Sequence, residues 1–532
     1  MPSRLHAHIS RQPRWLLAWL LGLLLVLGGC ANLPANDQQT PSYALPMQQA
    51  TPLGQLAGQL RQQSGSRHTT GFRLLGSADT AFSARLALTQ QAQRTLDLQY
   101  YAIHADASTR ELLLAVRDAA ARGVRVRILL DDFNTQGPDA QVLQLAFVPG
   151  VEIRLFNPIR GPRSNGFLRI LSSLHDFKRM QHRMHNKLFL ADNAFGITGG
   201  RNLGDVYFGQ GDRSNFIDLD VLATGQQVRA MSASFDKYWN NPLAYPVETL
   251  LSKKEIAALT PASGSSEPAA DSHGIGPTQT TPAQRSFPQA MELASQPWIW
   301  APSVLLSDSP AKLDPEDHSS DDVPTVVEGL LDMMQQARQQ ITIVSPYFVP
   351  GDKMMERFAE LRQRGVKIVV LTNSLSSTDA AFAHIGYARY RERLLALGVQ
   401  LYEMRALQQS SVRSAFGSSG SPSRASLHSK LVIVDGRILS IGSMNLDLRS
   451  KLQNTEVALI IRSRALSREI TERMQPLLDN GTWKVLQQPD GSLLWQMQPP
   501  GSGPDQFQDP DSSVLLRSIL WIISPLAPDE LL

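Results

Sequence analysis

The sequence predicts an α/β protein whose two halves repeat one another. Residues 184–202 and 427–445 carry the same polar residues at the same spacing. The order of helical and strand-like segments around them also repeats, and such alternation predicts right-handed βαβ units with buried parallel strands. A chance match of six spaced positions is expected well below about once in a million starting points, so we interpret the chain as an internal duplication.

Each half has a predicted layout of helix, strand, helix and strand. The segments expected in the first half are a helix over residues 81–94, a strand over 95–103, a helix over 109–122 and a strand over 124–130. Their counterparts in the second half are a helix over 326–339, a strand over 341–348, a helix over 353–364 and a strand over 366–372. The strands are near-continuous aliphatic runs, which are typical of strands covered by helices on both faces.

A hairpin is predicted later in each half. Strands over residues 188–191 and 195–198 flank Asp192-Asn193, and strands over 431–434 and 438–441 flank Asp435-Gly436. Asp-Asn and Asp-Gly are strong signals for a tight turn between two strands. We therefore expect each polar motif to lie on a two-strand hairpin.

The remaining segments define a domain plan. We assign residues 1–29 to a lipoprotein signal peptide, 30–70 to a tether, 71–259 to the first domain, 260–295 to a flexible linker, 296–495 to the second domain and 496–532 to a tail. In the signal, three arginines precede an apolar run that ends in Gly28-Gly29-Cys30. Cys30 is the only cysteine of the chain, so no intrachain disulfide can form, and its place after two glycines predicts a lipidated thiol. The tail contains an apolar segment, residues 514–526, that is too short to span a bilayer. We expect it either to dock on the body of the protein, which we favour, or to dip into the membrane interface.

Composition limits the possible functional classes. The 532 residues are 42% hydrophobic and 19% charged, as in an ordinary globular protein. The formal charge of +3 falls to 0 when residues 1–29, which hold three arginines and no acidic residue, are removed. A general nucleic-acid binder would keep a basic excess, so we expect no nucleic acid as a partner.

The two motifs share a His-x-Lys pattern followed by Asp, a Gly-Gly or Gly-Ser pair, and Asn. The first copy supplies His185, Lys187, Asp192 and Asn202, and the second supplies His428, Lys430, Asp435 and Asn445. Side chains two positions apart in a strand point to the same face, so each histidine and its lysine share one face of the sheet. The small residues before each asparagine let the backbone approach a ligand and return the asparagine beside the histidine.

Two imidazoles, two ammonium groups and two amides suit the chemistry of a phosphodiester. Lysines and amides stabilise a five-coordinate phosphorus as negative charge builds up. One imidazole can attack phosphorus while the other protonates the departing alcohol and later deprotonates the acceptor. The expected reaction is a two-step transfer through a phosphohistidine, without a cofactor. A metal site is disfavoured because the lysine after each histidine would repel a divalent ion.

Each histidine needs a partner that fixes its tautomer. Alignment of Asp220-Val221-Leu222 with Glu456-Val457-Ala458 nominates Asp220 and Glu456, on strands downstream of the respective motifs. Asp218, two residues earlier on the same face, competes with Asp220. Asp192 and Asp435 lie at the turns, where a carboxylate can either organise the hairpin or contact the substrate, and both roles stay open.

The stretches from His185-Asn186-Lys187 to Asn202 and from His428-Ser429-Lys430 to Asn445 resemble the paired motifs of the phospholipase D superfamily. The similarity covers most of residues 71–495 and, within the superfamily, points to bacterial cardiolipin synthases of the C type. This resemblance implies two phospholipase D-like α/β sandwich domains related by pseudo-twofold symmetry, with a metal-independent active site at their interface. It also implies that His185 is the nucleophile and His428 the acid and base, a choice that the symmetry of the motifs leaves open.

The resemblance implies transfer of a phosphatidyl group between phospholipids, as in cardiolipin synthesis, by a protein held on the membrane through lipidated Cys30. Hydrolysis to phosphatidic acid is an alternative because the motifs do not separate water from a lipid alcohol. A nuclease and a non-catalytic envelope scaffold are further alternatives. An exported lipoprotein belongs in the bacterial cell envelope, and Ala31 after the cysteine favours the outer over the inner membrane. The donor lipid, the acceptor lipid and the oligomeric state stay open.

Overall fold

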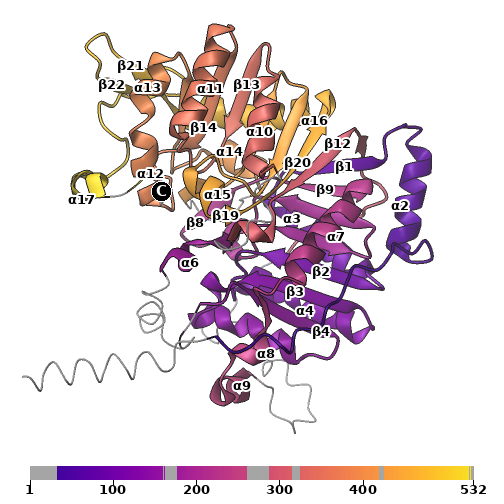
Figure 1. Ribbon diagram of the computed structural model, residues 1–532. Helices are drawn as coiled ribbons and strands as arrows, with labels where there is room; N and C mark the ends of the chain where they lie inside the picture. Colours follow the sequence, from indigo (N-terminus) through magenta and orange to yellow (C-terminus); the bar gives the residue numbers. More distant parts are fainter. Residues whose placement is uncertain are drawn as a thin grey trace, which may run out of the picture.

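Each half of the molecule is built on one nine-stranded sheet. The structure is a computed structural model that describes residues 33–159, 161, 177–259, 287–313, 324–417, 424–526 and 528. The strand order is β10-β4-β3-β2-β6-β7-β9-β1-β11 in the first sheet and β12-β20-β18-β17-β13-β14-β15-β21-β22 in the second. In Figure 1 the second half, in orange and yellow, lies above the first half, in indigo and magenta. The fold class expected from the sequence, two related α/β domains, is confirmed.

The two sheets share a central arrangement of strands. The order β3-β2-β6-β7-β9 in one sheet corresponds to β14-β13-β17-β18-β20 in the other, with parallel pairing of the first two strands and antiparallel pairing of the rest. The first sheet contains β1 (Thr70–Leu75), β2 (Thr95–Tyr100), β3 (Arg125–Asp131), β4 (Val151–Phe156), β6 (Leu188–Ala191), β7 (Phe195–Gly199), β9 (Asp220–Gly225), β10 (Ala244–Pro246) and β11 (Ile299–Trp300). The second contains β12 (Ser303–Ser307), β13 (Gln340–Val344), β14 (Lys367–Asn373), β15 (Gln400–Met404), β17 (Leu431–Val434), β18 (Ile438–Gly442), β20 (Val457–Arg462), β21 (Thr482–Gln487) and β22 (Leu493–Met497).

The helices also occur in corresponding places. Helices α3, α4 and α7 of the first half correspond to α10, α11 and α16 of the second in their order relative to the strands. The helices of the first half are α2 (Pro52–Gln63), α3 (Ala78–Gln91), α4 (Ala107–Ala121), α6 (Phe177–Gln181), α7 (Gln226–Trp239), α8 (Val247–Leu250) and α9 (Lys253–Leu259). Those of the second half are α10 (Val326–Gln335), α11 (Gly351–Gln363), α12 (Ala381–Ala388), α13 (Arg391–Ala396), α14 (Ser410–Ala415), α15 (Leu448–Leu452), α16 (Arg464–Asn480) and α17 (Val514–Ile523).

Local sequence signals explain where these elements begin and turn. Helix α3 starts before the expected residue 81 because Ser77 and Thr80 form a capping box. Both central residues of the first hairpin turn, Asp192 and Asn193, have a φ of 52°, and Asp435 and Gly436 have 52° and 59° in the second. Positive φ at both central positions gives the two-residue turn whose twist matches the strands, so the hairpins follow from the Asp-Asn and Asp-Gly pairs.

One apolar core joins the two halves. It contains Phe235 and Trp239 of α7 together with Ile470 and Leu477 of α16, and buried residues from the central strands of both sheets. Full burial of a large apolar side chain contributes about 1.5–3 kcal/mol. The two halves are therefore packed against each other as parts of one unit.

Two boundaries of the expected domain plan need correction. Residues 33–70, expected to be part of a tether, lie against the first half, where α2 packs and Gln39 donates hydrogen bonds of 2.9 Å to the carbonyls of Asn241 and Ala244. Composition suggested a tether because the segment has little apolar periodicity, but its amides find backbone acceptors on the domain. Strand β11, expected to belong to the second domain, pairs with β1 of the first sheet.

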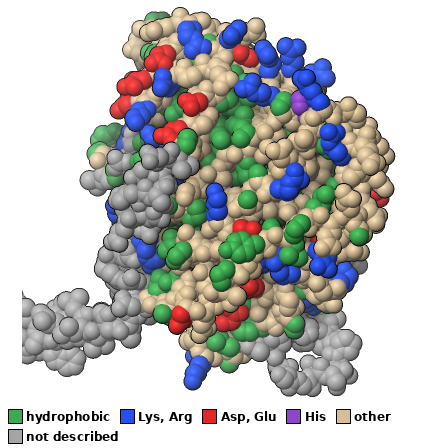
Figure 2. All heavy atoms as spheres, turned by 45° about the vertical axis from the view of Figure 1, so that its right-hand side comes forward, with side chains coloured by type: hydrophobic (Ala, Val, Ile, Leu, Met, Phe, Trp, Pro, Cys, Tyr) green, Lys and Arg blue, Asp and Glu red, His purple; other side chains and the backbone are tan. Residues whose placement is uncertain are grey.

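Other expectations lie outside the described residues. These are the signal peptide, Cys30 with its lipid, and residues 260–286 of the expected linker. Among the described residues, no helix combines the length and the hydropathy needed to cross a bilayer. On the face shown in Figure 2, lysine and arginine side chains are dispersed among apolar and uncharged ones.

Candidate active site

Two short two-stranded sheets lie at the boundary between the halves, and each positions one histidine. Strand β5 (Arg183–Met184) pairs in parallel with β19 (Asn454–Thr455), and β16 (Arg424–Leu427) pairs in parallel with β8 (Ser214–Ile217). Each of these sheets takes one strand from each half. Met184 pairs with Thr455, and Leu427 pairs with Ile217. The residue that follows each of these strands therefore lies next to its counterpart, the residue that follows its partner strand, across the boundary.

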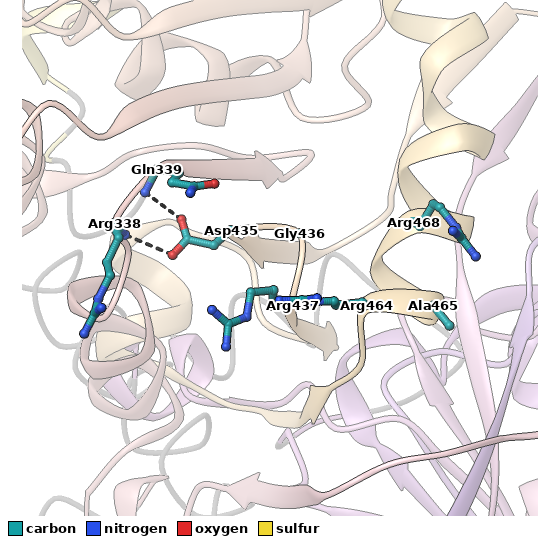
Figure 3. Close-up of a pocket in the computed structure, with 8 residues that line it drawn as sticks. All are labelled: Arg338, Gln339, Asp435, Gly436, Arg437, Arg464, Ala465 and Arg468. Atoms are coloured by element: carbon teal, nitrogen blue, oxygen red, sulfur yellow. Dashed lines mark hydrogen bonds between the residues drawn. The ribbon is translucent and has the colours of Figure 1, made fainter.

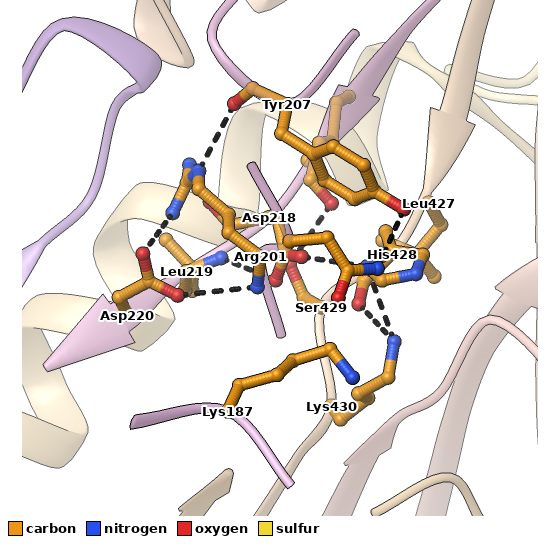
Figure 4. Close-up of polar contacts among 12 residues, drawn as sticks. Lys187, Arg201, Tyr207, Asp218, Leu219, Asp220, Leu427, His428, Ser429 and Lys430 are labelled. Carbon is orange, nitrogen blue, oxygen red and sulfur yellow. Dashed lines mark hydrogen bonds and ion pairs between the residues drawn. The ribbon is translucent and has the colours of Figure 1, made fainter. Parts of the chain in front are cut away.

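The counterparts are a histidine from one half and a carboxylate from the other. Nδ1 of His185 lies 3.0 Å from both carboxylate oxygens of Glu456. Nδ1 of His428 lies 2.7 Å from Oδ2 of Asp218, a pair visible in Figure 4. Both carboxylates are fully buried and both rings nearly so. Each imidazole is therefore oriented by a charged group that its own half does not supply.

The two lysines repeat one geometry. Nζ of Lys187 donates to the carbonyl of His185 at 2.8 Å, and Nζ of Lys430 donates to the carbonyl of His428 at 2.7 Å. Both side chains are buried. Burial lowers the pKa of Lys187 to about 7, with Glu456 opposing the shift and Lys430 adding to it. Because each lysine acts on groups of the other half, the two motifs form one site.

The rings are neutral in this environment. Burial lowers the pKa of His185 well below its usual value, and the charges of Lys187 and Lys430 lower it further. Burial and Lys430 lower the pKa of His428 in the same way. A neutral ring that donates from Nδ1 to a carboxylate keeps the lone pair on Nε2, the form that a nucleophile or a general base requires.

The carboxylates titrate near neutrality. Burial raises the pKa of Glu456 to about 7, against the opposing charge of Lys187. Burial also raises the pKa of Asp218 to about 6, against Lys430 and Arg201. Both carboxyl groups are therefore easier to protonate than usual, and their ionised forms stabilise a positive charge on the rings.

The asparagines of the motifs are buried beside these groups. Oδ1 of Asn202 accepts from the backbone N–H of Ala102 at 3.3 Å, and its Nδ2 donates to Oη of Tyr207 at 3.0 Å. Oδ1 of Asn445 is buried without a hydrogen-bond partner among the described residues. Within that same set, no group of three or more histidine, cysteine, aspartate and glutamate side chains is arranged to hold a metal ion. A reaction without a cofactor stays a prediction.

Comparison with known proteins places this site in a family. Residues 86–239 and 330–478 match a family model described as cardiolipin synthase, PLD-like domain. These two segments make up more than half of the chain and contain both histidine motifs. The chain belongs to this phospholipase D-like family. The family predicted from the sequence is confirmed, and so is the class of enzyme, a phospholipase D-type enzyme.

Several members of the phospholipase D-like family are similar over most of their length. Cardiolipin synthase C of Escherichia coli (strain K12) is 39% identical over 419 residues, which cover 78% of this chain and 86% of that protein. An uncharacterized protein of Helicobacter pylori (strain ATCC 700392 / 26695) is 30% identical over 88% of this chain and 90% of its own. The crystal structure of phosphatidylserine synthase from Haemophilus influenzae Rd KW20 has a TM-score of 0.55 and 13% identity, covering 89% of this chain and 98% of that one, and it shows the same fold.

Asp192 and Asp435 of the phospholipase D-like motif do not lie at the histidines. They are at the far ends of β6 and β17, where Asp192 accepts from the backbone N–H groups of Gln93, Arg94 and Thr95 at 2.7–3.2 Å. Asp435 accepts from three successive backbone N–H groups in the same way, two of which are drawn in Figure 3. The surface pocket beside Asp435, of about 730 Å³, is lined by four arginines and is separate from the histidines. Of the two roles left open for these residues, the contacts support organising the hairpin turn and not the catalytic role.

Asp220 is not the partner of a histidine, contrary to expectation. Its carboxylate lies 2.9 Å from Nη2 of Arg85, and both groups are buried. It also lies 3.4 Å from Nη1 of Arg201, which Figure 4 shows beside the site. In the hairpin register Gly199 pairs with Asp220, whereas the equivalent Gly442 pairs with Ala458. The correct alignment therefore makes Asp218 the equivalent of Glu456. The alignment that nominated Asp220 was shifted by two residues.

Aromatic rings complete the site, and the motif pattern did not identify them. The ring of Tyr101 meets His185 edge-on at 5.2 Å between centroids, and Tyr207 meets His428 edge-on at the same distance. Phe216 lies 4.8 Å from His428 on another side. Tyr101 follows the end of β2, and Tyr207 lies in a short 3-10 turn, η4 (Asp205–Tyr207), outside the repeated motifs.

Proposed function

We propose that the protein transfers a phosphatidyl group from one phospholipid to the hydroxyl of another and so makes cardiolipin. The observation that carries the proposal is the crossed pair of histidines, each oriented by a carboxylate of the other half with a buried lysine beside it. Similarity to a cardiolipin synthase over 78% of the chain supports this choice of reaction. A site with two equivalent imidazoles suits a phosphoryl ester that must be taken up and then released.

In the first step Nε2 of His185 attacks the phosphorus of the donor lipid. An N–P bond forms as the bond between phosphorus and the head-group oxygen breaks, and His428 gives its proton to the departing alkoxide. The bound phosphodiester is anionic, so it raises the pKa of His428 and allows that ring to carry the proton. Lys187 and Lys430 offset the charge that builds on the phosphoryl oxygens.

The second step reverses the first with a different alcohol. His428, now neutral, takes the proton from the hydroxyl of the acceptor lipid, whose oxygen attacks phosphorus while the N–P bond breaks. His185 leaves as the neutral ring, and the product is the new phosphodiester. Water in place of the lipid alcohol would give phosphatidic acid by the same steps.

The protein is further proposed to act on a membrane to which it is held by a lipid on Cys30. The signal sequence that ends in Gly28-Gly29-Cys30 supports this anchor. The same signal supports a place in the bacterial envelope, and Ala31 supports the outer membrane. Labelling of growing cells with a radioactive or clickable fatty acid would test the anchor, because Cys30→Ala abolishes the label if the proposal holds.

Mass spectrometry of the products tests the reaction. The purified chain is incubated with vesicles of phosphatidylglycerol and phosphatidylethanolamine, and we expect cardiolipin in amounts that His185→Ala and His428→Ala abolish. His68→Ala, a substitution at a histidine outside the site, is the matched control and keeps full activity. Phosphatidic acid as the sole product would replace the synthase by a hydrolase, and cleavage of DNA that needs Lys187 would replace both by a nuclease.

A donor substrate whose leaving group departs without protonation tests which histidine attacks phosphorus. With p-nitrophenol as the leaving group, His428→Ala should still release one equivalent in a burst, because the phenolate departs without protonation. His185→Ala should release none. A burst in His185→Ala and its absence in His428→Ala would assign the attack to the other ring.

A further inference from the structure

Exposed apolar side chains gather on the last helix of the chain. In α17, Val514, Leu515, Ile519, Trp521 and Ile522 are between 47% and 79% exposed. Phe507, before the helix, and Phe382, on the neighbouring α12, are 66% and 58% exposed. Among the described residues, these seven are more than half of all exposed large apolar side chains. Single exposed apolar residues are ordinary, but a cluster of this kind marks an interaction surface.

The helix docks by a narrow face and leaves the other face free. Leu520 is buried against Leu375 and Ile385, and Leu516 and Ile523 pack around this contact. The guanidinium of Arg389 donates to the carbonyl of Ser524 and holds the end of the helix. The expected docking of this segment on the protein is confirmed, but only one face of α17 is in contact and the opposite face is exposed.

The surface that carries the exposed cluster is connected to the active site through α12. Helix α12, on which α17 packs, begins at Ala381, two residues after Asp379. The carboxylate of Asp379 accepts from Oη of Tyr347 at 2.8 Å, and its charge acts on both His428 and Lys430. One short helix therefore connects the exposed cluster to the catalytic rings.

We propose that α17, with Phe382, enters the surface of a phospholipid bilayer and holds the active site against it. The proposal rests on the proposed function, in that the site acts on lipids. Helix α17 has no acidic residue and carries Arg517, and Arg389 lies exposed at its end. Exposed Asp505 and Asp511 precede the helix, so the apolar side chains of α17, and not a positive excess, supply the attraction to a bilayer. Tryptophan at the rim of such a face is typical of side chains that sit at the level of the head groups.

The size of the surface favours a bilayer over a second copy of the chain. A helix of 10 residues is about 15 Å long. One face of it offers a few hundred square ångströms, whereas each partner in a stable protein interface buries about 800 Å². A bilayer needs no matching surface, and a few immersed side chains are enough for interfacial binding.

Labels placed on the full chain test this orientation directly. In a Cys30→Ser background, Ile522→Cys and Val304→Cys each give one attachment point for a nitroxide, and Val304 is a matched control because it is 50% exposed on β12. With vesicles of phosphatidylcholine and phosphatidylglycerol in equal parts, we expect the accessibility of the 522 label to a nickel chelate, relative to oxygen, to fall roughly tenfold. The 304 label should not change. A 522 label that stays in water, or that becomes immobile without vesicles as the protein concentration rises, would overturn the proposal.

Activity on two forms of the substrate gives a second, independent readout. Trp521→Ser/Ile522→Ser should lower turnover of vesicle lipids about tenfold or more, since each buried apolar side chain contributes about a factor of ten to partitioning. Turnover of a short-chain monomeric phospholipid should stay unchanged, as should both activities in Val304→Ser. Equal turnover of vesicles by the double variant and wild type contradicts the surface. A wild-type chain without activity on either substrate contradicts the proposed function, while the labels still report on α17.

Discussion

Asp218→Asn removes the charge that orients His428 and keeps the size of the side chain. The carboxylate lies 2.7 Å from Nδ1 of His428 and is fully buried. An amide in its place offers no charge to an imidazolium. Its NH2 group can also donate to Nδ1, which favours the tautomer that carries the proton on Nε2. The rate should therefore fall without a comparable loss of folded protein.

The expected size of the effect follows from one charged hydrogen bond. Such a bond contributes about 1.5–3 kcal/mol, and 1.36 kcal/mol corresponds to a factor of ten in rate, so kcat should fall about 10- to 150-fold. The pKa of Asp218 is about 6, and the ionised form is the one that orients the ring. In the wild type kcat should therefore rise as the pH rises through about 6, and Asp218→Asn should lack this rise.

Asp220→Asn is the matched comparison, two residues further along the chain at the start of β9. Asp220 pairs with Arg85 and Arg201 and contacts neither histidine. Loss of one partner from a buried ion pair costs about 3–5 kcal/mol, so the variant should melt a few degrees lower and keep its kcat once folded. The assay is steady-state transfer at several pH values together with thermal unfolding. A normal kcat in Asp218→Asn beside a hundredfold loss in Asp220→Asn would refute the crossed pairing.

Three further predictions follow from the same contacts. Glu456→Gln should abolish activity and raise the melting temperature at pH 8. The folded pKa of Glu456, about 7, lies above the usual 4.5, so the wild type loses stability on the order of 3 kcal/mol as the pH rises from 4.5 to 7. In a thermal scan at pH 4 the higher melting temperature of the variant should vanish. Asp192→Ala should lower the free energy of unfolding by a few kcal/mol in urea titration, because three backbone N–H groups lose their acceptor. The kcat should stay unchanged, and a large fall in kcat would restore a role at the substrate. Gly200→Ala should lower kcat at least about tenfold, since the added Cβ meets the carboxylate of Asp218 and displaces it. Ser443→Ala, at the corresponding place in the second motif, adds no atom there and removes the hydrogen bonds of Oγ with Glu456 and with the backbone of Val457, so kcat should fall less.

The sequence predicted the scaffold well where local chemistry decides. Strands β6 and β17 begin and end at the expected residues because Asp-Asn and Asp-Gly turns fix the hairpins. Strand β2 was expected to reach Ile103 but ends at Tyr100, because the chain there leaves the sheet and Ile103 forms an isolated bridge with Leu203. Apolar runs report burial, and they do not distinguish a paired strand from an extended segment beside it.

The pairing of the site could not be read from the sequence in the same way. His185 and Glu456 are 271 positions apart, and His428 and Asp218 are 210 apart. No periodicity within one half contains information on which half supplies a partner. Asp218 and Asp220 are two residues apart and look equivalent in the sequence, but Asp220 begins β9 whereas Asp218 lies between β8 and β9, and the register of β7 against β9 separates them. The duplicated motif identified the reacting groups, and the tertiary structure determines how they are paired.

The two halves are similar in fold but give the histidines different surroundings. Burial and Lys430 lower the pKa of His428, and Asp379 opposes that shift, whereas the charges that act most strongly on His185, those of Lys187, Lys430 and Arg449, all lower its pKa. The partner of His428 also has the lower pKa, about 6 against about 7 for Glu456, so it stays ionised more readily and stabilises an imidazolium. A ring that is held neutral suits attack on phosphorus, and a ring that can be protonated suits the acid and base role. This difference, which the symmetric motifs do not contain, agrees with the proposed roles of His185 as the nucleophile and His428 as the proton carrier, and the p-nitrophenol burst decides between the two rings.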